Sequence, residues 1–235
     1  MRVLSTQVWL KAEFAERPDL LPTGKAVADK ILTRLNTAWN QSKSQSATPA
    51  AANRYRELLL VADAEIGEMT AQAGDIPCRL GCNYCCKDEK IVLTEKEAVL
   101  AIQHVEKILS IEQKARVVAS ILAAAPTSDE ASVPCAFLID ERCSIYESRP
   151  LACRSYFSRS VSSCHDFFLD KSQMPLRFSA PKMVEMAVRE VTRAAKYSKL
   201  YEVNTLMRRI YADPAKPAQW GAERMSDESD LADPE

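Results

Sequence analysis

Cysteines are the residues of this sequence best suited to chemistry: there are eight of them, and six lie between residues 78 and 143. The first four form the compact pattern C-x3-C-x2-C-C, and the others follow at wider spacing. In a reducing compartment thiols stay unpaired, so clustered cysteines indicate metal ligands or redox groups before they indicate disulfides. We therefore predict that all eight are metal ligands: Cys78, Cys82, Cys85, Cys86, Cys135, Cys143, Cys153 and Cys164.

The compact pattern cannot bind a single ion from a straight helix. Cys78 and Cys86 would lie about 12 Å apart along the axis, at about 1.5 Å of rise per residue. Two thiolates on one zinc ion lie at most about 4.6 Å apart, because each Zn–S bond is about 2.3 Å long. Either the backbone folds back at Gly81, or the pattern takes ligands from elsewhere in the chain. The later cysteines supply such ligands, so we predict that the two groups meet in space.

Four arginines lie close to the cysteines in the sequence, namely Arg79, Arg142, Arg149 and Arg154. A tetrathiolate site around zinc or a [4Fe–4S] core carries a net charge of about −2. Cationic side chains beside such a site offset this charge and lower the pKa of the thiols. We expect these arginines to be charge partners of the metal centre.

The spacing leaves the metal open between zinc and iron. Structural zinc sites are closed sets of four ligands, and eight cysteines could form two of them. Iron–sulfur clusters are held by sets of four cysteines, often with one remote ligand. The compact cysteine triple followed by distant cysteines favours an iron–sulfur cluster slightly over paired zinc sites.

The motif C-x3-C-x2-C-C, followed by Cys135…Cys143-Ser-Ile-Tyr…Arg149-Pro-Leu-Ala-Cys153-Arg, resembles the YkgJ-type cysteine-cluster family of zinc- or iron-chelating domains. The resemblance covers about residues 78–157. It implies a metal site formed by the seven cysteines from Cys78 to Cys153, whereas Cys164 lies outside the matching part. It implies no particular reaction, although a flagellin lysine N-methylase carries a similar cluster.

Composition places the chain among ordinary globular proteins, with 235 residues, 47% hydrophobic residues and a net charge of −1. Near-neutral charge argues against a general nucleic-acid or membrane-surface protein. Five glycines are too few for a glycine-rich nucleotide fold. The sequence shows neither a secretory signal nor an apolar run of about 18 residues. We therefore expect a cytoplasmic protein with an unidentified protein partner.

No catalytic residue is assigned. The chain has two histidines, His104 and His165. We expect His104 on a helix flank and His165 in an exposed loop beside Cys164, so neither is predicted to act as a base.

Helical periodicity dominates the elements that must position these cysteines. Residues 24–43 place Val27, Ile31, Leu35 and Trp39 on one helix face, and residues 51–73 form a second amphipathic helix. Thr94 and Ser110 each begin a capping box and open further helices, the second of which is expected to bury Leu122. The predicted fold is mainly α, a single-domain helical bundle with an irregular cysteine-rich segment.

Four regions follow from this pattern. Residues 1–76 form an N-terminal helical region, 77–179 the cysteine-cluster core, 180–213 a long C-terminal helix and 214–235 an acidic disordered tail. Residues 131–179 lack helical periodicity, so a bound metal is expected to order them. Short strands are expected only at residues 90–93 and 136–139.

The sequence leaves three functions open. The first is a metalloprotein whose cysteine cluster binds an iron–sulfur cluster or zinc and has a redox or protein-modification role. The second is a zinc-stabilised interaction module without chemistry. The third is a component of a protein-lysine methylation system, which rests on the resemblance alone.

Overall fold

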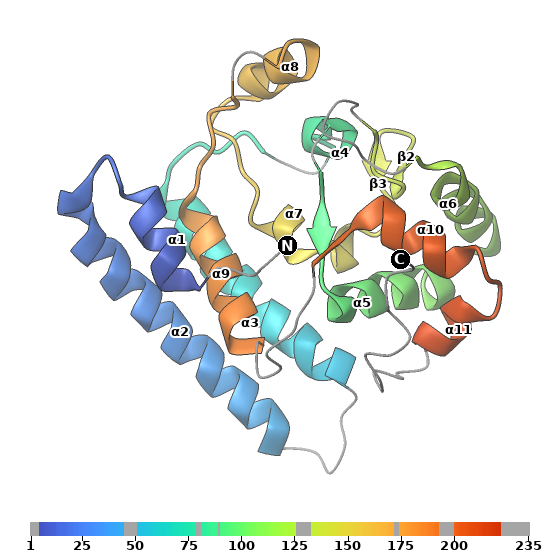
Figure 1. Ribbon diagram of the computed structural model, residues 1–235, viewed down its shortest axis with the longest axis horizontal. Helices are drawn as coiled ribbons and strands as arrows, with labels where there is room; N and C mark the ends of the chain where they lie inside the picture. Colours follow the sequence, from blue (N-terminus) through green and yellow to red (C-terminus); the bar gives the residue numbers. More distant parts are fainter. Residues whose placement is uncertain are drawn as a thin grey trace, which may run out of the picture.

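Two groups of helices lie side by side in the computed structural model, and the cysteine-bearing segments lie between them at one end (Figure 1). The structure describes residues 5–44, 51–78, 81–88, 90–125, 133–171, 174–192 and 200–221. The fold is mainly α, as predicted.

The first helical group consists of α1 (Thr6–Glu13), α2 (Leu21–Ser44), α3 (Ala51–Gln72) and α9 (Ala180–Thr192), with the short 3-10 helix η1 (Pro18–Leu20) before α2. Helices α2, α3 and α9 contact one another, and α1 contacts both α2 and α9. Their apolar faces form a first core, which includes Leu10, Ile31, Leu35, Tyr55 and Val184.

The predicted inner face of α2 is correct except at its first position. Ile31, Leu35 and Trp39 are buried, but the side chain of Val27 is 41% exposed and its neighbour Ala28 is buried instead. At this point the buried position of α2 is therefore one residue later than the i, i+4 spacing suggested.

The second helical group consists of α5 (Glu95–Lys107), α6 (Ile111–Ala123), α10 (Val203–Tyr211) and α11 (Lys216–Gly221). Both predicted capping boxes are present at the starts of α5 and α6. A second core lies among these helices and includes Ile102, Ile121, Phe137 and Met207. Leu122 of α6 was expected to be buried but is 43% exposed, because Ile121 takes the core-facing position.

Two small antiparallel sheets connect these parts. Strand β1 (Val92–Leu93) pairs with β4 (Tyr201–Glu202), with Val92 opposite Glu202. Strand β2 (Leu138–Ile139) pairs with β3 (Arg142–Cys143) in a hairpin. Strands β1 and β2 lie where short strands were predicted.

The cysteine-rich segment contains more regular structure than expected. Helix α4 (Tyr84–Asp88) precedes it, and η2 (Tyr146–Ser148), α7 (Leu151–Arg154) and α8 (Val161–Leu169) lie within it. Ser160 accepts a hydrogen bond from the Ser163 amide and so caps α8. These helices are too short to produce a clear apolar period, which is why the sequence pattern suggested an irregular segment.

The predicted long helix over 180–213 is wrong. Helix α9 ends at Thr192, and the chain then forms β4 before α10 begins. The Val203 amide donates to the Ile91 carbonyl at 3.0 Å, and Glu202 caps α10 by accepting from the Asn204 and Thr205 amides. This cap and the pairing with β1 carry the chain from the first helical group to the second.

The predicted acidic tail, residues 214–235, starts too early, because residues 216–221 form α11. Trp220 on this helix packs against both cores and accounts for its order. The rest of that tail lies outside the described residues.

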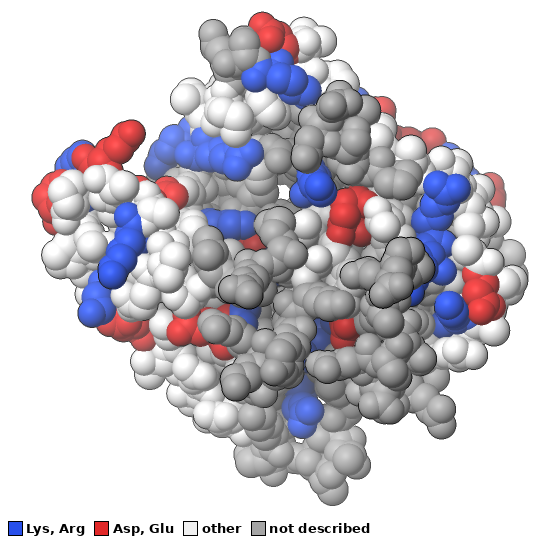
Figure 2. Space-filling model, viewed as in Figure 1, with Lys and Arg blue, Asp and Glu red and all other residues white. Residues whose placement is uncertain are grey.

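On the face shown in Figure 2, acidic and basic side chains are interspersed, which agrees with the near-neutral net charge. Among the described residues, no helix has the combined length and apolarity that a membrane crossing requires.

Candidate metal centre

All eight cysteines line one cavity of about 120 Å³. Cys82 lies in the loop before α4, Cys85 and Cys86 on α4, Cys143 on β3, Cys153 on α7 and Cys164 on α8. The two cysteine groups, which are far apart in the sequence, therefore face the same space, as predicted. Their role as metal ligands stays a prediction.

The thiols surround a volume and do not converge on a point. Within the described part of the chain, no three Cys, His, Asp or Glu side chains form a group that could hold one metal ion as they are positioned. The cavity is roughly tenfold larger than the volume of about 10–15 Å³ that one water molecule needs. Thiolates are the ligands that zinc and iron–sulfur clusters prefer, so the donor set fits either group.

The backbone does fold back at Gly81, one of the two alternatives that the spacing left open. Gly81 has a φ of 96°, a left-handed conformation that glycine adopts without a steric penalty. After this turn the Asn83 carbonyl accepts from the amides of Cys86 and Lys87 and starts α4. The reversal lets Cys78 and Cys85 face one cavity, which a straight helix would prevent.

The β2–β3 hairpin fixes α4. Asp140 and Glu141 at its tip have φ values of 49° and 62°, the left-handed pair of a type I′ turn. The Glu141 carboxylate accepts from Asn83 Nδ2 at 2.7 Å and pairs with Lys87, so these two groups lower its pKa. The Cys135 amide donates to the Cys86 carbonyl at 2.7 Å. The cysteines of α4 are thereby held beside those of the hairpin.

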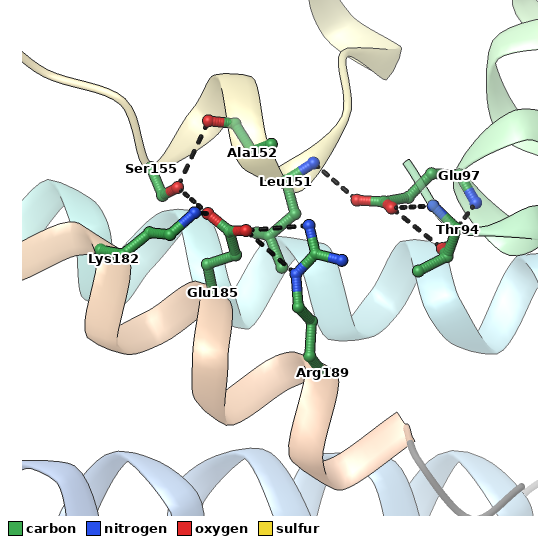
Figure 3. A network of polar contacts seen from close by, with 8 residues as sticks. All are labelled: Thr94, Glu97, Leu151, Ala152, Ser155, Lys182, Glu185 and Arg189. Atoms are coloured by element: carbon green, nitrogen blue, oxygen red, sulfur yellow. Dashed lines mark hydrogen bonds and ion pairs between the residues drawn. The ribbon is translucent and has the colours of Figure 1, made fainter. Parts of the chain in front are cut away.

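A buried polar network fixes α7, which carries Cys153 (Figure 3). One oxygen of Glu97 accepts from the Leu151 amide at 2.6 Å, and its other oxygen accepts from Thr94. Ser155 donates to Glu185, which also forms a buried ion pair with Arg189. Because both carboxylates are at least 98% buried, these bonds define the position of α7.

Charges inside this network compensate one another. Burial alone would raise the pKa of Glu185, but Arg189, Lys182 and Ser155 stabilise the carboxylate and leave its pKa below the ordinary value. Glu185 is therefore ionised at neutral pH in spite of its burial.

The arginines near the cysteines have different roles. Arg149 lines the cavity, stacks on Tyr146 at 3.9 Å and partly offsets the rise that burial causes in the pKa of Cys143, so it lies where a charge partner was expected. Arg142 also lines the cavity. Arg154 is buried and pairs with Asp63 of α3, so it attaches α7 to the first helical group instead. Arg79 lies outside the described residues.

Cys78 and Cys164 lie on the side of the cavity next to α8. Cys78 Sγ accepts from the Ser158 amide at 3.1 Å. The Ser158 hydroxyl in turn donates to the carbonyls of Ser160 and Leu176. Cys164, which the sequence motif did not reach, is 8% exposed and lines the cavity.

The two histidines do not enter the cavity lining. His104 contacts the Ser148 hydroxyl at 3.1 Å, and burial lowers its pKa. His165 is exposed, as expected, but it lies on α8 and not in a loop. Its ring meets the edge of Tyr84, with the centroids 5.7 Å apart.

Burial keeps four of these eight thiols protonated in the metal-free chain. It raises the pKa of Cys78 to about 11 and of Cys135 to about 12, and it raises the pKa of Cys143 and Cys153. Such thiols lose their protons when a cation binds, so the site is suited to metal coordination more than to nucleophilic attack.

Sequence reasoning missed several residues that support the centre. The capping box identified Glu97 as a helix cap but gave no sign that it also accepts from Leu151. The pairings of Ser155 with Glu185 and of Cys78 with Ser158 connect positions 30 and 80 residues apart. No local sequence signal could have revealed them.

Comparison with known families agrees with this assignment of the site. Residues 77–174 match the CxxCxxCC family, described as a "putative zinc- or iron-chelating domain". Searches of curated proteins and of solved structures give no match. The matched segment carries all eight cysteines of the cavity. The resemblance read from the cysteine pattern is thus confirmed, because residues 77–174 match the model of that family.

Proposed function

We propose that the cavity binds zinc or iron, as ions or as an iron–sulfur cluster, and that the bound centre serves a redox or protein-modification reaction. The observation that supports this proposal is the convergence of eight thiols from separate segments on one cavity. Cysteines that served only as small core residues would not gather around a shared space beside an arginine.

A chemical role is favoured over a purely structural one, because apolar packing already orders the cysteine-rich segment. Phe137, Ile145 and Leu151 within it are at most 1% exposed and belong to the two cores. Seven of the eight cysteines are only partly buried. The centre can therefore be reached from the surface.

The chain's own residues would bind and tune such a centre. The thiols would give up their protons to bind it, Arg149 would offset the charge of the thiolates, and Phe137 and Ile145 would exclude water from one side. A bound iron–sulfur cluster would supply one-electron transfer, whereas zinc would supply Lewis acidity.

The test is elemental analysis and visible spectroscopy of the full chain purified without oxygen. We expect stoichiometric iron with the visible absorption of a thiolate-bound cluster, or stoichiometric zinc. A chain that retains neither metal, and takes up neither after reduction and reconstitution, would overturn the proposal of metal binding.

The redox role has its own test within the same experiment. If the chain is colourless, holds only zinc and keeps the same absorption spectrum on adding reductant or oxidant, the redox role is wrong. The chain would then be a zinc-stabilised interaction module. The methylation alternative gains no support from the geometry, and titration with S-adenosylmethionine in a calorimeter would check it independently.

A further inference from the structure

The cysteine cavity has two halves with different surroundings. Cys135, Cys143 and Cys153 pack against the second hydrophobic core, and we call them the core half. Cys78, Cys82 and Cys164 form the α8 half, in which Cys78 is bound by Ser158 and Cys164 is carried by α8. Different structural elements therefore hold the two sets of thiols.

Interactions among the thiols follow the same division. Cys135, Cys85 and Cys143 lie close enough to Cys153 to add to the rise that burial causes in its pKa. Cys82, Cys164 and Cys85 lie close enough to Cys78 to add to the rise that burial causes there. Cys85 alone occurs in both sets, so it lies within reach of both halves.

The position of α4 explains the intermediate place of Cys85. Asn83 and Lys87 bind Glu141 at the tip of the hairpin that carries Cys143. On its other side α4 contacts α8, where Tyr84 meets the rings of His165 and Phe168. The helix thus lies between the hairpin and α8, and Cys85 lies between the two halves.

The number of thiols matches a two-centre arrangement. A tetrahedral thiolate site needs four sulfurs, so two such sites that share one sulfur need seven. The core half and the α8 half contribute three each, and Cys85 is the seventh. A division into two sets also agrees with a cavity that is larger than one ion. No three of the described thiols lie close enough to hold an ion as they are positioned, so the thiols of each set would move toward their ion on binding.

We propose that the cavity holds two divalent metal ions side by side, with Cys135, Cys143 and Cys153 on one, Cys78, Cys82 and Cys164 on the other, and Cys85 bridging both. This inference rests on the proposed metal-binding function and specifies its ligands. Each of the seven thiols releases its proton to the solvent when the ions bind, and no oxidation or reduction takes place. Cys86 lines the cavity as the eighth thiol and is not assigned to either ion.

Zinc stoichiometry tests this division directly. The full chain is reduced, stripped of metal and titrated with Zn²⁺ in competition with a chromophoric chelator, and bound zinc is then counted by elemental analysis. Wild type is expected to bind two tight equivalents, and Cys153→Ser and Cys78→Ser are each expected to bind one. Cys85→Ser should lose tight binding at both positions. Loss of an equivalent in Cys86→Ser would show that the eighth thiol is a ligand and would contradict the assignment.

A measurement on the unmodified chain keeps the proposal testable if a variant fails to fold. Cadmium NMR of the cadmium-loaded protein should show two resonances that are split by coupling through the shared Cys85 sulfur. The two-centre arrangement would be overturned if wild type bound one tight zinc equivalent and either Cys153→Ser or Cys78→Ser abolished it. A single cadmium resonance would overturn it as well. Both results would leave metal binding itself intact. A wild-type chain that binds neither zinc nor iron would instead refute the proposed function itself.

Discussion

The core half and the α8 half of the cavity differ in what holds them. The core half lies on the second hydrophobic core, and Cys153 is positioned by the buried carboxylates Glu97 and Glu185. The α8 half depends on hydrogen bonds around Ser158 and on a nine-residue helix with exposed apolar residues such as Leu169, which is 68% exposed. Packing therefore positions the thiols of the core half before a metal binds, whereas we expect a bound metal to stabilise the α8 half more.

The largest expected effect comes from the buried charges behind the core half. Glu185→Gln leaves the buried Arg189 without the carboxylate that it hydrogen-bonds, and we expect a loss of about 3–5 kcal/mol in the free energy of unfolding. Urea denaturation of the metal-free chain measures this loss. Glu65→Gln is the matched control, because Glu65 is also buried but pairs with the half-exposed Arg34, far from the cysteines. Equal losses in the two variants would contradict a special role for Glu185.

Metal removal should separate the two halves. A metal at about 100 times its Kd stabilises the state that binds it by about 2.7 kcal/mol. We expect a chelator to increase proteolytic cleavage near α8, between residues 158 and 171, much more than within the hairpin at residues 135–143. Mass spectrometry of the fragments measures this difference. Equal protection of both segments after chelation would show that packing preforms the α8 half as well.

The contact between α4 and the hairpin should affect metal affinity more than stability. Glu141→Ala removes the carboxylate that binds Asn83 and Lys87, although the Glu141 carbonyl still accepts from Asn83. We expect zinc affinity to fall about tenfold, as when other residues that orient ligands are lost. Competition with a chelator measures the affinity. Asp140→Ala is the control, because Asp140 lies in the same turn but pairs with Arg116 of α6. If both variants bound zinc equally well, the contact with α4 would not position Cys85.

The smallest expected effect concerns the hydroxyl of Ser158. Ser158→Ala removes its hydrogen bonds to the Ser160 and Leu176 carbonyls, at a cost of about 1 kcal/mol. Because the backbone amide that binds Cys78 is retained, we expect both metal positions to stay filled, with faster release from the α8 half. The release rate of zinc to excess chelator measures this. Cys78→Ser removes the metal position of the α8 half, so zinc release from the core half can be measured alone in that background. If Ser158→Ala speeds release there as well, the division into two halves is wrong.

Local signals in the sequence predicted the parts of the fold that depend on neighbouring residues. The capping boxes at Thr94 and Ser110 marked the starts of α5 and α6, and the apolar spacing marked α2 and α3. The long C-terminal helix was wrong because its interruption depends on pairing between Tyr201 and Leu93, more than 100 residues apart. Periodicity cannot reveal such a contact.

Cysteine spacing predicted the cavity but not its organisation. It showed that the two groups had to meet, since four helical cysteines could not share an ion. The prediction for Cys164 rested on its residue type alone, because the pattern that resembles the family covered only about residues 78–157. The spacing also did not show that Arg154 turns away to Asp63, since its sequence neighbour Cys153 gave no information on the direction of the side chain.

X-ray absorption spectroscopy at the edge of the bound metal shows which atoms coordinate it. If the metal lies in the cysteine cavity, we expect a first coordination shell of sulfur alone, at about 2.3 Å for zinc. A shell dominated by nitrogen or oxygen at about 2.0–2.1 Å would show instead that the metal lies outside the cysteine cavity.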